Sequence, residues 1–157
     1  MVTLLATILF VIYGLGIATY DFFAQLIRNR VLLKLFATLL FFALLNFLSN
    51  PAFRYETPFR VACFIAFAMF HIILGLISGL RIGAGDTKYA MVVSFFLSAI
   101  LPVQILVPGN LVAIFNSWVI GAIMAWRRWL QLKSQTAIPM APALFFGALT
   151  GVLYSFF

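Results

Sequence analysis

The chain has 157 residues, of which 66% are hydrophobic and only 8% are charged. Soluble domains carry about a quarter charged residues, so this composition excludes a soluble enzyme and indicates a multi-pass membrane protein. A net charge of +7 would suggest nucleic acid as a partner if the protein were soluble. Because the cations lie between apolar segments, we expect contacts with anionic lipid head groups instead, and no nucleic-acid partner. The single cysteine excludes an internal disulfide, and no metal or cofactor is expected.

Six apolar segments follow one another along the chain, most of them long enough to cross about 30 Å of hydrocarbon as helices. Polar loops are expected over residues 50–60 and at Pro108-Gly109-Asn110, and a glycine-rich stretch over residues 79–88. We therefore predict an all-α integral membrane protein, with six transmembrane helices in one compact bundle and a single domain over residues 1–157. The predicted spans are residues 2–20, 31–49, 61–80, 89–108, 111–126 and 138–157.

Positive charge is concentrated on one side of the predicted bundle. The junctions after the first, third and fifth spans hold most of the cations, whereas the opposite side holds only Arg54 and Arg60. The positive-inside rule places the odd-numbered junctions in the cytoplasm and both termini outside. The cations on the cytoplasmic side are Arg28, Arg30, Lys34, Arg81, Lys88, Arg127, Arg128 and Lys133.

The chain has only three acidic residues, Asp21, Glu56 and Asp86. Asp21 follows the first span and Asp86 the third, so both carboxylates are expected at the cytoplasmic membrane boundary. Ionisable groups at a membrane are costly and usually functional. Two neighbouring carboxyl groups do not both ionise readily, so one can activate water while its protonated partner polarises a carbonyl. The structural alternatives are a snorkelling interfacial residue for Asp21 and a helix N-cap for Asp86.

Two glycines and a lysine surround the second of these aspartates. Gly83 and Gly85 permit backbone conformations and close approaches that side chains would forbid. Lys88 either acts on the nearby carboxylates or anchors the chain to lipid phosphates.

Other features of the sequence favour helix packing. The pairs Gly75/Gly79 and Gly147/Gly151 are small-x-x-x-small patterns that pack helices within one chain or between copies, so homo-oligomerisation stays open. His71 has no second ligand-type residue at helical spacing, which favours a packing residue over a metal ligand.

Three segments, taken in order, resemble the bacterial type IV prepilin peptidases, which are membrane aspartic proteases with a Gly-x-Gly-Asp signature. Asp21 is followed by Ile27-Arg28-Asn29, similar to the family's aspartate followed at the same spacing by Ile-Pro-Asn. The stretch from Gly83 to Lys88 matches Gly-x-Gly-Asp-x-Lys, and Ile138-Pro139-Met140-Ala141-Pro142 is similar to a C-terminal Ile-Pro-aromatic-Ala-Pro segment. Each segment is weak alone, but their order and the hydropathy together are specific.

The resemblance implies that Asp21 and Asp86 are the catalytic pair of an aspartic endopeptidase. Its substrate would be a pilin-like precursor, cut at the cytoplasmic face of the inner membrane just before its hydrophobic helix. Arg28 stands where the family usually has proline, which predicts a different turn after the first span. The resemblance also assigns substrate-binding or supporting roles to Gly83, Gly85, Lys88, Arg28, Asn29, Pro139 and Pro142.

The small size looks most like the peptidases of tight-adherence (Flp) pilus systems. The N-terminal region of full-length members, with its paired cysteines and methyltransferase activity, is absent here, so we expect cleavage without N-methylation. An archaeal-type preflagellin peptidase is an alternative. A second alternative is a small transporter or assembly subunit that uses the two aspartates for protons or cations. Transport carboxylates are expected nearer the bilayer midplane, whereas both aspartates here lie at span ends, which favours proteolysis.

Overall fold

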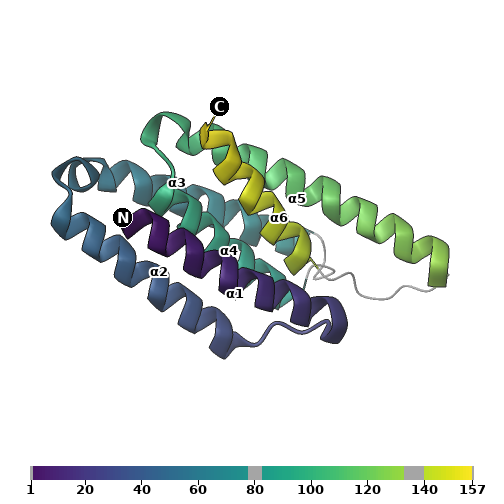
Figure 1. Ribbon diagram of the computed structural model, residues 1–157. Helices are drawn as coiled ribbons and strands as arrows, with labels where there is room; N and C mark the ends of the chain where they lie inside the picture. The colour runs from purple at the N-terminus through teal and green to yellow at the C-terminus, as the bar shows by residue number, and fades with distance from the viewer. Residues whose placement is uncertain (1, 78–82, 133–139, 157) are drawn as a thin grey trace.

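The computed structural model describes residues 2–77, 83–132 and 140–156. Over these ranges the chain forms six α-helices and one short 3-10 helix, and the helices run back and forth as a bundle (Figure 1). Their bounds are α1 Val2–Ala24, α2 Asn29–Ser49, α3 Pro51–Ile77, α4 Ala84–Ile100, α5 Val103–Leu132, α6 Ala141–Leu153 and η1 Tyr154–Phe156.

Four of the helices, α1, α2, α3 and α5, are long and apolar enough to cross a membrane. The other two are shorter, with 17 residues in α4 and 13 in α6. Large apolar side chains such as Leu4, Phe41 and Phe115 lie exposed on the outside of the bundle, where hydrocarbon would cover them. The all-α prediction is therefore confirmed. The number of membrane crossings and the side on which the termini lie stay predictions.

The short helix α4 occupies the middle of the bundle. It packs against all five other helices, and eight of its 17 residues are buried. Phe96 stacks on Phe10 of α1 with the ring centroids 3.7 Å apart, and Tyr89 is fully buried. Because the other helices surround α4, a residue in its first turn lies among them.

The polar loop predicted over residues 50–60 is wrong, because α3 begins at Pro51. The Asn50 side-chain oxygen accepts the N–H groups of Ala52 at 3.1 Å and Phe53 at 3.4 Å. An N-capping asparagine followed by proline in the first helical position is a strong start signal for a helix. The charged residues of this stretch pair along the same helix, with Arg60 Nη2 2.7 Å from Glu56 Oε2.

The loop predicted at Pro108-Gly109-Asn110 is also wrong, because α5 runs through it. A Cβ on Gly109 would lie 2.6 Å from Leu101 Cδ1, so the glycine permits a close helix contact. The Asn110 side chain donates to the Leu106 carbonyl of its own helix at 2.8 Å. Residues that form turns in water are retained in helices where packing and side chains satisfy the backbone.

The connection between α4 and α5 lies instead at Leu101-Pro102. Leu101 has an extended ψ of 144°, as expected of a residue that precedes proline. The buried guanidinium of Arg60 donates from Nη1 to the carbonyl oxygens of Ser98 and Leu101, at 2.9 and 2.8 Å. Arg60 therefore satisfies the last carbonyls of α4, at the opposite end of that helix from Asp86.

Candidate active site

Asp21 lies in the last turn of α1 and is buried, with 3% of its surface exposed. The helix continues past the predicted end of the first span and closes at Gln25, which has a left-handed φ of 51° and donates its N–H to the Asp21 carbonyl at 2.8 Å. The Asp21 carboxylate accepts the N–H of Ala141, the first residue of α6, at 3.1 Å. A helix N-terminus favours a negative charge. Asp21 is therefore held inside the bundle and is not a snorkelling interfacial residue.

Asp86 lies in the first turn of α4, ahead of the predicted apolar span 89–108. The N-cap of α4 is Gly83, so Asp86 is the third helical residue and not the cap. Its carboxylate accepts the backbone N–H of Gly83, which is half of a capping box. The backbone N–H of Met140, next to the Ala141 that binds Asp21, also hydrogen-bonds Asp86. The start of α6 thus contacts both aspartates.

The two carboxyl groups influence each other. Burial, and next the negative charge of Asp21, raise the pKa of Asp86 to about 7, although the Gly83 and Met140 hydrogen bonds act in the opposite direction. One carboxyl oxygen, Oδ1, is buried and has no hydrogen-bond partner among the described residues. The structure therefore brings Asp21 and Asp86 together and holds a proton on Asp86 near neutral pH.

Gly83 and Gly85 allow neighbouring parts of the chain to pack closely beside the two aspartates. A Cβ on Gly85 would lie 3.1 Å from Cβ of Ile27, so glycine lets the α1–α2 connection lie against the start of α4. A Cβ on Gly83 would lie 3.0 Å from Asp86 Oδ2. Both glycines are therefore explained by close approaches at the site.

The model of the type IV leader peptidase family matches residues 5–126. The chain belongs to this family. The matched range includes both aspartates and ends before α6. No curated protein and no solved structure gives a match. Membership supports a protease of the leader-peptidase kind, and the apolar helices make this family member a multi-pass membrane protein.

Two further residues of the family-like motifs connect α4 to α2. Lys88 Nζ donates to the Asn29 side-chain oxygen at 3.1 Å, and Asn29 is the first residue of α2. The lysine therefore holds the start of α2 beside the first turn of α4. Its ammonium keeps two donors for other acceptors.

Arg28 is the N-cap residue of α2, with a φ of −73°. That angle lies in the range that proline adopts, so the arginine preserves the backbone conformation that a proline would impose. That the turn after the first span differs from that of proline-containing members of the family stays a prediction. The side chain points to Tyr20, donating from Nη2 to its hydroxyl at 3.0 Å, with the guanidinium 5.0 Å from the ring centroid.

Pro142 lies in the first turn of α6, directly after the Ala141 that binds Asp21. Proline is tolerated there because the first N–H groups of a helix have no partner within it. The residues named from the sequence that lie outside the described part of the chain are Gly79, Arg81, Lys133, Ile138 and Pro139.

His71 lies beside this site, a position that no sequence pattern predicted. His71 is 8% exposed and lines a small cavity together with Asp86, Thr87, Ser117 and Trp118. Residues 71 and 86 lie on different helices, α3 and α4, and their spacing in the sequence carries no periodic signal. The N–H groups of Met140 and Ala141 could not be predicted as part of the site either, because no side-chain pattern identifies a backbone donor.

A moderate loss of activity is expected when Gly83 is replaced by alanine. The added methyl group would displace the Asp86 carboxylate, because its Cβ lies within 3.0 Å of Oδ2. Small misplacements of catalytic groups cost about 10- to 100-fold in rate. We expect kcat/KM for a leader substrate to fall about 10-fold, whereas Thr38→Ala, at a half-buried position of α2 whose hydroxyl hydrogen-bonds to its own helix, leaves it unchanged. Unchanged cleavage by Gly83→Ala would show that the tight contact does not position Asp86.

Proposed function

We propose that the chain is an aspartic endopeptidase that removes the leader of type IV, Flp-type pilin precursors at the cytoplasmic face of the inner membrane. The observation that carries the proposal is the pair of neighbouring carboxyl groups, Asp21 buried and Asp86 partly buried with a raised pKa, within a member of the leader peptidase family. An aspartic peptidase requires two neighbouring carboxyl groups, one of them ionised and the other protonated.

In the proposed mechanism Asp21 is the ionised member and takes a proton from water. The water oxygen attacks the scissile carbonyl carbon, and protonated Asp86 donates its proton to the carbonyl oxygen. When the C–N bond of this tetrahedral intermediate breaks, Asp21 returns its proton to the leaving amine and Asp86 recovers a proton from the hydroxyl. Both groups end in their starting states, and no cofactor takes part.

The proposed orientation follows from charge. The end of the bundle that holds the aspartates also holds Arg28, Arg30, Lys34 and Lys88, whereas Arg60 lies at the far end of α4. The positive-inside rule then places the site toward the cytoplasm and the termini outside, with the cations near anionic head groups. We infer a single peptidase domain, and both a monomer and a homo-oligomer are compatible with its glycine-lined helix faces.

The peptidase proposal is tested with the purified protein in vesicles and a panel of precursors. We expect cleavage of a Flp-type prepilin just before its hydrophobic helix. Preferential cleavage of a preflagellin would favour the archaeal-type alternative. Absence of cleavage of every precursor, together with aspartate-dependent proton or cation flux, would favour the transporter alternative.

The pH dependence of cleavage follows from the Asp86 pKa. The group must be protonated to donate, so kcat/KM should fall as the pH rises through about 7. At acidic pH the rate should fall again as the ionised member of the pair gains a proton, which gives a bell-shaped pH–rate profile. The two apparent pKa values of this profile describe the coupled pair and not one aspartate each. A rate that stays constant between about pH 5 and 9, or rises above pH 7, would exclude a proton-donating Asp86.

A further inference from the structure

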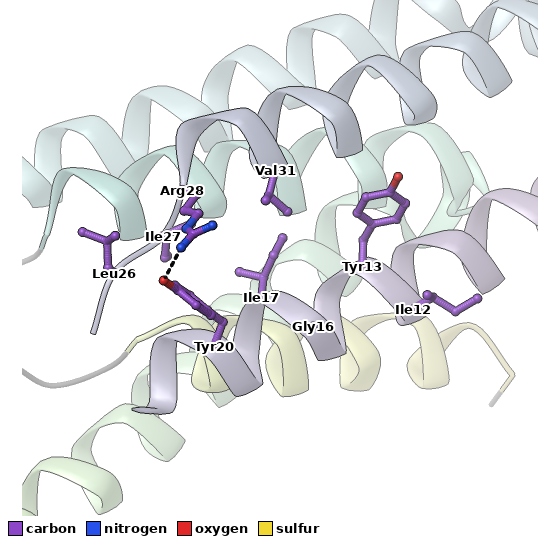
Figure 2. Close-up of a pocket in the computed structure, with 9 residues that line it drawn as sticks. All are labelled: Ile12, Tyr13, Gly16, Ile17, Tyr20, Leu26, Ile27, Arg28 and Val31. Atoms are coloured by element: carbon purple, nitrogen blue, oxygen red, sulfur yellow. Dashed lines mark hydrogen bonds between the residues drawn. The ribbon is translucent and has the colours of Figure 1, made fainter. Parts of the chain in front are cut away.

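An apolar groove lies between α1 and α2 near the ends that carry the site (Figure 2). Its volume is about 360 Å³. Ile17 from α1 and Val31 from α2 lie on its two sides. We call it the α1–α2 groove, and it is lined by Ile12, Tyr13, Gly16, Ile17, Tyr20, Leu26, Ile27, Arg28 and Val31.

The α1–α2 groove adjoins both aspartates through residues of its own lining. Ile17 precedes Asp21 by one turn of α1 and Tyr20 precedes it directly. Ile27 lines the groove and also lies against Gly85, the neighbour of Asp86. A peptide bond held between the two carboxyl groups would therefore have this apolar space beside it.

The mouth of the groove is polar. Arg28 and Tyr20 close it through their hydrogen bond and stacking contact (Figure 2). A guanidinium has five N–H donors, and the Tyr20 hydroxyl accepts one of them. The others can bind carbonyl oxygens of a chain that leaves the groove. An apolar interior with donors at its mouth fits a peptide that changes from apolar to polar near the cleaved bond.

The space itself depends on Gly16. A Cβ on Gly16 would meet no atom within 4 Å, so packing does not require a glycine there. By contrast, a Cβ on Gly14, two residues away on the same helix, would collide with the Phe145 ring. Gly16 leaves room in the groove that no residue of the described chain fills.

We propose that the α1–α2 groove binds an apolar side chain of the substrate beside the scissile bond, and that Gly16 sets the size of the side chain it admits. This inference rests on the proposed peptidase function. The occupant is a residue of the substrate's hydrophobic segment, because the groove is lined by apolar side chains and two of them lie close to the site: Ile17 is one turn from Asp21 and Ile27 lies against Gly85.

The first test is Gly16→Leu, which extends a side chain into the groove from a position where an added Cβ meets no atom within 4 Å. With a prepilin as substrate, we expect kcat/KM to fall at least 10-fold. The loss should shrink to threefold or less when one large apolar residue next to the scissile bond is changed to alanine. The matched control is Ala66→Leu, which places the same leucine side chain on the exposed surface of α3, away from the groove.

The outcomes separate this proposal from the proposed function. Normal cleavage by Gly16→Leu, or an equal loss for every substrate variant, would overturn the groove assignment while leaving the peptidase in place. An equal loss for every substrate is the result expected if a lipid acyl chain occupies the groove. A parent enzyme that cleaves nothing would instead refute the proposed function.

A second measurement decides the matter even if Gly16→Leu does not fold. Ile12→Cys places a thiol in the groove, and Asp21→Asn prevents turnover of the bound substrate. After Cys63→Ser, the new cysteine should form a disulfide with a cysteine in the substrate's hydrophobic segment when an oxidant such as copper phenanthroline is added. The control Ala66→Cys should not. Cross-linking that is absent, or equal at the two positions, would overturn the proposal.

Discussion

Asparagine in place of either Asp21 or Asp86 is expected to reduce cleavage at least about 1,000-fold, because groups that act as a unit lose nearly all their effect when one is removed. The change keeps the size of the side chain and removes the group that exchanges a proton. Asp21→Asn keeps an oxygen that can accept the Ala141 N–H. A loss of rate at unchanged protein level would therefore report chemistry and not folding. The measurement is single-turnover cleavage of a Flp-type prepilin in membranes, at equal expression of each variant.

The third acid of the chain provides the control for this experiment. Glu56 pairs with Arg60 in the first turns of α3, far along the bundle from the site. Glu56→Gln removes a carboxylate but keeps an acceptor for the guanidinium, so cleavage should stay within about twofold of the parent rate. If Asp21→Asn and Asp86→Asn cleave as well as Glu56→Gln does, the two aspartates are structural and the aspartic mechanism fails. A double variant that is no slower than either single variant is expected, because the pair acts as a unit.

The aspartate pair could be predicted from the sequence because acids are so scarce in this chain. With only three acidic residues and short connections, the alternation of spans was enough to place Asp21 and Asp86 at the same end. The structure adds that both meet the start of α6. A backbone donor at residue 141, which is 120 residues from its acceptor, has no signature in the sequence.

The helix boundaries were less predictable, since turn-forming residues act differently in a membrane protein. Asn50-Pro51 starts a helix at once, and Pro108 lies inside one. At Asn50-Pro51 the Asn50 side chain accepts an N–H of the first turn, and at Pro108-Gly109 the glycine permits a close contact with Leu101. Propensities measured in water do not include these tertiary and capping contacts.

The central place of α4 was not predictable either. With 17 residues α4 is shorter than the four long apolar helices, and its first turn carries a charged residue. Its position depends on contacts with five other helices, which no local pattern encodes. The partly buried position of Asp86, and therefore its raised pKa, follows from that placement.

The contact between α5 and α6 shows that the small-x-x-x-small pattern at Gly147 and Gly151 is a packing motif of the bundle. A Cβ on Gly147 would collide with the Ser117 hydroxyl and the Ala113 carbonyl of α5. A Cβ on Gly151 would lie 2.8 Å from the Gly109 carbonyl. The Asn116 side chain also donates to Thr150 Oγ1 across this contact, at 3.1 Å. Since α6 starts at the aspartates, the same contact holds Ala141 beside Asp21.

Gly147→Ala is therefore expected to destabilise the protein by about 3 kcal/mol, the upper part of the range for overpacking, because the obstructing carbonyl belongs to a helix backbone that cannot turn away. The same substitution at Gly16 meets no atom within 4 Å and should be neutral or stabilising by up to about 1 kcal/mol, since alanine favours a helix over glycine. Both glycines lie inside helices, so the gain in helix propensity is the same for both substitutions. The difference in stability between the two variants therefore measures the cost of overpacking at Gly147. Unfolding in detergent, followed by circular dichroism, measures the difference. Equal stability of the two variants would mean that α6 can move away from α5 at little cost, and the start of α6 could then not fix the position of Asp21.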